Sequence, residues 1–300
     1  MSYDKRLAAP LLISLILIGA HWSYGILRGY DAILLAVLSC IAAELVLSRL
    51  LLGQRRHLAS AYISGISVAI LIRSPMLWPY AVGGVLSIMS KYILCVKGRH
   101  LWNPSNFGIC VLLFLGPFAV APLSVQWGND LWPMLVIWAV GAIAVWRAGR
   151  AHITAAYVAS FFLLAFVRSL ITGGSFVTEI APITGPMYQL FALFMITDPK
   201  TTVASKWGAV AVVFLIAFVE MLLRLAEVIY APFYALFLVG PAALLLEMWW
   251  TSRARAPQAR SAEISGAAEG SGASRRSVRP RSVGRHPHAA PLPGRAPRPG

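Results

Sequence analysis

Residues 207–225 read WGAVAVVFLIAFVEMLLRL, a run in which Glu220 and Arg224 are the only charged side chains. An apolar run of about 20 residues can cross the hydrocarbon core of a bilayer, about 30 Å thick, as one helix. The rest of the chain has the same character, because 58% of its 300 residues are apolar and only 12% are charged. A water-soluble domain has about 25% charged residues. The composition therefore excludes an ordinary soluble enzyme, a coiled coil and a disordered scaffold, and it predicts an all-α polytopic membrane protein.

The other apolar runs predict about ten transmembrane helices, some of them short or broken. The first run lacks a signal-peptide cleavage site and is followed by further spans, so we interpret it as a transmembrane helix. The third and eighth runs are short and lie beside glycine and proline, which is typical of broken or re-entrant helices. The predicted spans are 8–27, 31–50, 58–73, 76–96, 105–123, 131–147, 151–171, 185–198, 207–225 and 230–250.

Basic residues are distributed unevenly between the loops that alternate across this predicted membrane. Loops on the side of the N-terminus carry two or three basic residues each, whereas the opposite loops carry one or none. Short cytoplasmic loops of membrane proteins carry such an excess of lysine and arginine. We therefore expect a multi-pass protein of the plasma (inner) membrane with both termini in the cytoplasm.

The composition changes after Trp249 and Trp250, which are typical of an aromatic anchor at a membrane interface. Residues 251–300 contain ten arginines and two glutamates and almost no large apolar side chain. Such a segment cannot bury a core. The sequence thus predicts a transmembrane domain at 1–250 and a disordered Arg/Pro-rich cytoplasmic tail at 251–300. The tail either contacts anionic lipid headgroups or has no specific role. The net charge of +15 fits this topology, and no nucleic-acid partner is expected.

Charged residues inside the predicted spans need a physical reason, because a charge at the bilayer centre costs at least about 2.5–3.5 kcal/mol. Glu44 precedes Arg49 by about one turn, and Glu220 and Arg224 have the i, i+4 spacing that puts both on one helix face. Lys91 lies in an otherwise apolar span, after two serines. These residues indicate either structural ion pairs or a polar lining for a buried ligand or ion path.

Two polar turns each follow an apolar run and contain a proline. Residues 97–108 read KGRHLWNPSNFG and residues 195–202 read MITDPKTT. The residue before a proline is pushed out of helical geometry, so each helix is expected to end there. Asparagine, aspartate, serine and threonine can cap the next helix, and a capped N-terminus beside Arg99 or Lys200 favours an anion such as a flavin phosphate. Plain helix capping at a membrane boundary is the alternative.

The sequence contains no conventional soluble catalytic motif. It lacks GxSxG, HExxH, Walker-type and GxGxxG elements, and its histidines have no metal-pair spacing. Catalytic residues are therefore unknown. Any enzymatic role is that of a subunit in a membrane oxidoreductase complex.

Both proline turns lie in segments that resemble the NqrB/RnfD family of membrane electron-transport subunits. The resemblance is carried by residues 64–70 (SGISVAI), Lys91, residues 99–108 (RHLWNPSNFG) and residues 194–199 (FMITDP), and it covers about residues 10–245. It implies an integral membrane subunit that binds flavin, relays electrons in the membrane and has other electron-transport subunits as partners. Short loops and the Asp-Pro-Lys-Thr-Thr ending resemble a divergent UnbU-like branch, found with enediyne biosynthesis.

The family carries FMN attached to a threonine in a Ser/Thr-Gly-Ala-Thr motif with an aspartate upstream. Here residues 172–180 read TGGSFVTEI, so Ser175 and Thr178 keep the frame while Phe176 and Val177 replace the small residues. Thr172 stands where the aspartate would be. The resemblance therefore implies FMN or riboflavin that is bound non-covalently rather than covalently. The cofactor-binding residues it implies are Ser175 and Thr178 near the outer face, and Lys91, Arg99, Asn103, Thr197, Asp198, Lys200 and Thr201 on the inner face.

Two functions remain open on the sequence. The first is the electron-transport subunit. The second is a transporter-like protein, or an accessory protein of natural-product biosynthesis, without its own redox centre.

The two proline turns also look like equivalent points of an internal repeat. The ten-span count puts both turns on the cytoplasmic side, whereas an inverted repeat would place them on opposite sides of the membrane.

Overall fold

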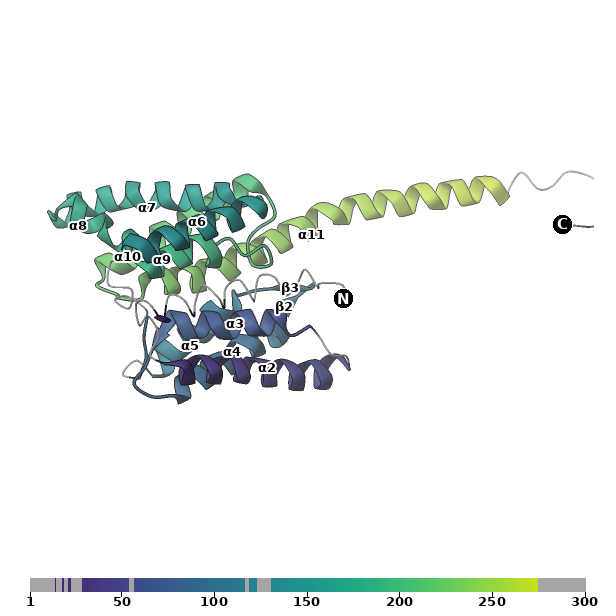
Figure 1. Cartoon of the computed structure of the whole chain (residues 1–300). Helices are drawn as coiled ribbons and strands as arrows, with labels where there is room; N and C mark the ends of the chain where they lie inside the picture. Colours follow the sequence, from purple (N-terminus) through teal and green to yellow (C-terminus); the bar gives the residue numbers. More distant parts are fainter. Residues whose placement is uncertain are drawn as a thin grey trace, which may run out of the picture. The chain divides into compact units, whose positions relative to one another are not determined.

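The computed structural model describes residues 29–53, 57–116, 119–122 and 131–274, together with the isolated positions 14, 18 and 21–22 (Figure 1). Side chains from 254 onward, and those of a few residues before it, are outside the description. The chain divides into two units, 1–248 and 249–300, close to the predicted boundary at 250. Most of the predicted first span at 8–27 and the last residues, 275–300, lie outside the described residues.

In the part of the chain that the structure describes, four helices form the N-terminal group of the first unit. They are α2 (Tyr30–Leu52), α3 (Ala59–Leu71), α4 (Trp78–Ile93) and α5 (Pro104–Leu115). Helix α2 packs against α3 and α4, and α4 packs against α5 (Figure 1). Two short antiparallel strand pairs accompany them: β1 (Ile72–Arg73) pairs with β4 (Ala121–Pro122), and β2 (Cys95–Val96) pairs with β3 (Arg99–His100). The turn between β2 and β3 has positive φ at Lys97 and Gly98.

Small residues allow close approach of these helices, and Gly108 is the clearest case. A Cβ added at Gly108 would lie 2.6 Å from the backbone oxygen of Gly83 on α4. Gly108→Ala is therefore expected to push α4 and α5 apart and to lower the free energy of unfolding by about 1–3 kcal/mol. Thermal unfolding in detergent measures this loss.

Gly240→Ala is the matched control for that substitution, because the nearest atom to its added Cβ lies at an ordinary 3.5 Å. Alanine is also the better helix former, by up to about 1 kcal/mol. A Gly108→Ala variant as stable as Gly240→Ala would contradict the close packing of α4 on α5.

A second group of helices follows in the same unit. It contains α6 (Leu131–Arg147), α7 (Ala151–Thr172), α8 (Phe176–Ile180), η1 (Ala181–Thr184), α9 (Pro186–Leu190), η2 (Phe191–Met195), α10 (Lys206–Leu225) and the first part of α11 (Ala231–Ser274). Helix α7 packs on α10, and α9 with η2 packs on α6. The single turn η2 is a π-helix, closed by the Ile196 N–H donating to the Phe191 carbonyl at 3.2 Å. Such turns are rare and are often found at functional sites.

The structure confirms a mostly helical chain, but it does not give ten clear spans. Among the described residues, four helices are long and apolar enough to cross a membrane: Tyr30–Leu52, Ala151–Thr172, Lys206–Leu225 and Ala231–Arg253. Helices α4 and α5 have 16 and 12 residues, shorter than the predicted spans 76–96 and 105–123. At 1.5 Å per residue they measure roughly 24 and 18 Å, less than the apolar thickness of a bilayer. The differences arise because α4 is followed by the strand β2 within the apolar run, and α5 ends at its C-cap Gly116.

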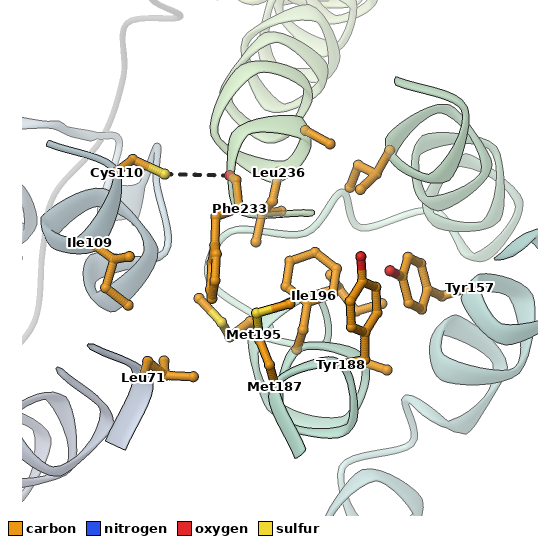
Figure 2. Close-up of a cluster of buried hydrophobic side chains, with 14 of the residues drawn as sticks. Leu71, Ile109, Cys110, Tyr157, Met187, Tyr188, Met195, Ile196, Phe233 and Leu236 are labelled. Atoms are coloured by element: carbon orange, nitrogen blue, oxygen red, sulfur yellow. Dashed lines mark hydrogen bonds between the residues drawn. The ribbon is translucent and has the colours of Figure 1, made fainter. Parts of the chain in front are cut away.

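Buried side chains join the two helix groups of the first unit (Figure 2). Leu71, Ile109 and Cys110 come from the first group, and the second contributes Tyr188, Met195 and Phe233, among others. The Cys110 thiol donates to the Phe233 carbonyl at 3.5 Å. The core therefore continues from α5 to the start of α11.

Helix α11 continues to Ser274, beyond position 250 where the sequence predicts the disordered tail to begin. Residues 251–274 contain seven alanines and three arginines, which are good helix formers, and also five serines, three glycines and Pro257, which are not. At its start in the second unit, the Arg253 guanidinium lies 4.1 Å from the centre of the Trp249 ring.

Candidate functional site: an amphipathic cavity beside the two proline turns

The two proline turns lie side by side. Asn103 caps α5, because its Oδ1 accepts from the Asn106 N–H at 3.2 Å, and its Nδ2 donates to Asp198 Oδ2 at 3.4 Å. Asp198 Oδ1 also accepts from the Lys200 N–H at 3.0 Å. The Asn103–Asp198 contact therefore brings the two proline turns together.

Another pair of turns is similar in sequence. Residues 72–75 (IRSP) follow the short helix α3, and residues 196–199 (ITDP) follow η2. The first of these turns lies at the start of α4, where the Ser74 N–H donates to the Tyr80 hydroxyl at 3.2 Å. The second lies near the end of α4, beside Asn103. The two similar turns are thus at opposite ends of α4.

A cavity of about 640 Å³ lies beside the touching turns. Charged and polar side chains from the end of α4, from β3 and from the two turns line it, among them Lys91, His100, Asn103, Thr197, Asp198 and Lys200. The rest of the wall comes from α3, α6 and η2 and is mostly apolar, with Ile63, Ile70, Ile137, Val140, Leu193 and Met195 among its residues, although α3 also contributes Ser60, Ser64 and Ser67. Ligand sites in proteins have volumes of about 300–1,000 Å³ and combine apolar walls with a few polar groups. The shape and lining therefore suit an amphipathic ligand of cofactor size.

Lys91 carries the buried positive charge of this cavity. It is 6% exposed, and its Nζ donates to the backbone oxygen of Ser60 at 3.2 Å and to its Oγ at 3.1 Å. An ammonium group has three donors. The third donor of Lys91 is therefore available to an acceptor on a ligand in the cavity.

Asp198 adds a titratable carboxyl at the same end. Burial raises the pKa of Asp198, because water no longer stabilises the charged form, while the Lys200 N–H and the lysine charges partly oppose this effect. The turn that contains Asp198 lies outside the four long apolar helices. Burial thus makes Asp198 easier to protonate than a free carboxyl group.

The structure brings five of the nine predicted site residues to the cavity wall: Lys91, Asn103, Thr197, Asp198 and Lys200. Arg99 lies nearby but is held elsewhere, because its guanidinium pairs with Glu247 at 2.8 Å and donates to the Thr202 carbonyl. Thr201 donates to the Asp198 carbonyl at 3.4 Å and is not part of the wall.

Ser175 and Thr178 do not line the cavity. Both side chains are exposed, at the beginning of the five-residue helix α8. Their neighbour Glu179 forms an ion pair with the buried Arg168. The segment that resembles the flavin-attachment motif is thus separate from the cavity.

The α3 residues of the cavity wall were not among the site residues predicted from the sequence. Ser60, Ser64 and Ser67 line the cavity and have the i, i+4, i+7 spacing that puts them on one helix face. This spacing is visible in the sequence and could have predicted a polar face on α3. The α6 wall is apolar and carries no comparable signal, because any lipid-facing helix has such residues.

A second buried polar cluster lies between α7, α9 and α10. Glu220 is 1% exposed; its Oε2 accepts from the Tyr157 hydroxyl at 2.7 Å, and its Oε1 accepts from the Tyr188 hydroxyl at 2.6 Å and from Arg224 Nε at 3.2 Å. Figure 2 shows the two tyrosine hydroxyls turned toward each other. Arg224 also donates to the Tyr188 hydroxyl. Of the two interpretations of the Glu220–Arg224 spacing, the structural ion pair is the one observed.

Comparison with models of known protein families gave no match, and comparison with curated proteins gave none either. The resemblance to the NqrB/RnfD family therefore depends on the motifs quoted above.

Proposed function

We propose that the protein is a membrane electron-transport subunit of the NqrB/RnfD kind, with an UnbU-like character, and that its cavity binds FMN or riboflavin non-covalently. The observation that carries the proposal is the buried Lys91 ammonium at the polar end of an otherwise apolar cavity of about 640 Å³. The motifs of the family resemblance meet at this cavity. Its other expected partners are the bilayer and further electron-transport subunits, and the expected location is the plasma membrane with cytoplasmic termini.

The residues present fit a flavin in chemistry and size. The apolar wall suits the flat ring system, and Lys91 with Lys200 suits either an anionic phosphate or the carbonyl edge of the ring. Bound flavin would supply the one- and two-electron chemistry. The chain would hold the ring between α3, α6 and η2, orient its polar edge and exclude water from the apolar part.

Non-covalent binding is favoured by the position of the attachment-like segment. Thr178 is exposed on α8 and does not line the cavity. A flavin joined to Thr178 would thus not reach Lys91 through the described cavity. Replacing Thr178 by alanine is expected to leave the flavin content unchanged.

The first experiment is a visible absorption spectrum of the full chain purified in mild detergent, followed by acid precipitation. Near-stoichiometric flavin that is released to the supernatant supports the proposal. Flavin that stays in the precipitate would support covalent attachment instead. Colourless protein from cells with ample flavin would overturn the proposal.

A transporter-like function is the second candidate, and the broken helix favours it. The π-turn η2 interrupts a short helix directly beside the cavity, and broken helices form substrate sites in many transporters. Uptake by vesicles that contain a colourless protein would support this function. A colourless protein without uptake activity would support an accessory role in natural-product biosynthesis.

Ligand binding is expected to depend on pH through Asp198. Because protonation removes the negative charge of Asp198 from the cavity, the affinity for FMN should rise as the pH falls through the raised pKa of Asp198. Asp198→Asn should remove the part of this dependence that Asp198 causes and bind FMN tightly already at neutral pH. Fluorescence titrations at several pH values measure the effect.

Riboflavin is the control ligand for this prediction, because it has no phosphate and should respond less to the Asp198 charge. An equal pH dependence of FMN binding in wild type and Asp198→Asn would contradict the assignment.

A further inference from the structure

Glu44 of α2 is buried, and only one of its two carboxylate oxygens accepts a hydrogen bond within the described part of the chain. The side chain is 3% exposed, and Oε1 accepts from the Tyr92 hydroxyl at 2.6 Å. Within the described part of the chain, Oε2 is buried and has no hydrogen-bond partner. A buried acceptor without a donor costs about 1–3 kcal/mol, and more when it is charged. A proton on Oε2 would remove that charge.

Glu220 is a second buried glutamate and provides a comparison within the same protein. Both of its oxygens accept hydrogen bonds, and Arg224 forms an ion pair with it. Glu44 has no ion pair among the described residues, including none with Arg49, which the sequence suggested as its partner. The two buried glutamates therefore have different surroundings on two sides of the same unit.

The neighbours of Glu44 connect it to the cavity. Cys40 lies one turn earlier on α2, and its thiol donates to the Gly84 carbonyl at 3.4 Å. Helix α4 contributes Tyr92 and Lys91, whose charge acts on Glu44, and α3 contributes the apolar Ala61 to the same cluster. Lys91 is turned toward Ser60 and lines the cavity. One buried cation thus faces both Glu44 and the ligand space.

We propose that Glu44 is a proton-exchange site that takes up one proton at Oε2 when an anion occupies the cavity beside Lys91. The Lys91 ammonium favours the charged form of Glu44, since opposite charges attract in a low-dielectric interior. An anionic ligand beside Lys91 offsets that effect, so the carboxylate binds a proton from solvent. The proton returns to solvent when the ligand leaves, and no electron transfer is involved. The coupling to a ligand rests on the proposed function, whereas the proton site does not.

Infrared difference spectroscopy of the full chain, between mildly alkaline and mildly acidic pH, tests the proton site directly. We expect a C=O band of a buried protonated carboxyl group to appear on acidification, to be lost in Glu44→Gln and to persist in Glu220→Gln. Tyr92→Phe keeps Glu44 but removes the hydrogen bond to Oε1, so the band should shift in frequency. A band that is unchanged in both Glu44→Gln and Tyr92→Phe, or no band at all, would overturn the proposal.

The coupling is tested with FMN as the added probe. In wild type, FMN should make the band appear at a higher pH. In Lys91→Met the band should appear at that higher pH already without FMN. If FMN does not bind, the band and its loss in Glu44→Gln still decide the proton site, and only the proposed ligand fails. Bound FMN that leaves the band of the wild type unmoved would overturn the coupling.

Discussion

Glu220→Gln is expected to lower the free energy of unfolding by about 3–5 kcal/mol, the usual cost of breaking a buried ion pair by removing one partner. The substitution leaves the Arg224 guanidinium, whose side chain is 20% exposed, without its counter-ion, and it puts a neutral amide in place of a carboxylate that is 1% exposed. It also weakens the acceptor of the Tyr157 and Tyr188 hydroxyls, because a neutral amide accepts more weakly than a carboxylate. Unfolding by a denaturing detergent in mixed micelles measures the loss.

Two variants serve as controls for this prediction. Glu247→Gln breaks the Arg99–Glu247 pair, whose side chains are 28% and 19% exposed, and partly exposed pairs contribute only about 0–1 kcal/mol. The double variant Glu220→Leu with Arg224→Leu removes both charges and should lose less stability than Glu220→Gln. If Glu220→Gln were no less stable than Glu247→Gln, Glu220 would not be charged in the folded protein.

Lys91→Met is expected to weaken FMN binding by roughly ten- to a hundredfold. A hydrogen bond to a charged group contributes about 1.5–3 kcal/mol, and 1.4 kcal/mol corresponds to a tenfold change in the dissociation constant. Methionine is apolar, and its unbranched side chain can fill most of the same space. The loss of FMN affinity therefore measures the contribution of the Lys91 charge. Titration of the purified variant with FMN, followed by flavin fluorescence, gives the ratio of the dissociation constants.

Lys206→Met is the matched control, because Lys206 is an exposed lysine at the start of α10 and does not line the cavity. Its FMN affinity should equal that of the wild type. The affinity for riboflavin, which has no phosphate, then shows which part of FMN contacts Lys91. If Lys91 holds the phosphate, Lys91→Met weakens only FMN, and if it holds the ring edge, both ligands weaken. Unchanged FMN binding in Lys91→Met would contradict the role of the cavity as the ligand site.

Helix positions follow closely from the local sequence. The predicted spans 31–50, 151–171 and 207–225 correspond to α2, α7 and α10 within two residues at each end. A helix satisfies its backbone hydrogen bonds within one segment, so an apolar run bounded by polar or helix-breaking residues is enough to locate it. The proline turns are predicted for the same reason, since the restriction of the residue before proline acts on its neighbour alone.

Helix lengths were less well predicted, because hydropathy alone overlooks a helix-breaking pair such as Gly116-Pro117 inside an apolar run. The apolar run at 105–123 predicts a full span, but α5 ends at Leu115. Residues Ala121–Pro122 pair instead with Ile72–Arg73, nearly fifty positions earlier. Hydropathy averages over such a segment and has no information on its distant partner.

The sequence by itself determined an apolar helical protein with two proline turns, a lysine in an apolar helix and an i, i+4 ion pair on α10. Only the tertiary structure decided that Asn103 touches Asp198, that Ser60 holds Lys91 beside a cavity, and that Tyr157 and Tyr188 satisfy Glu220. It also decided that Glu44 has no donor for Oε2 in the described part of the chain. Periodicity and capping depend on residues a few positions apart, whereas the partners of a buried polar group are set by how distant helices pack.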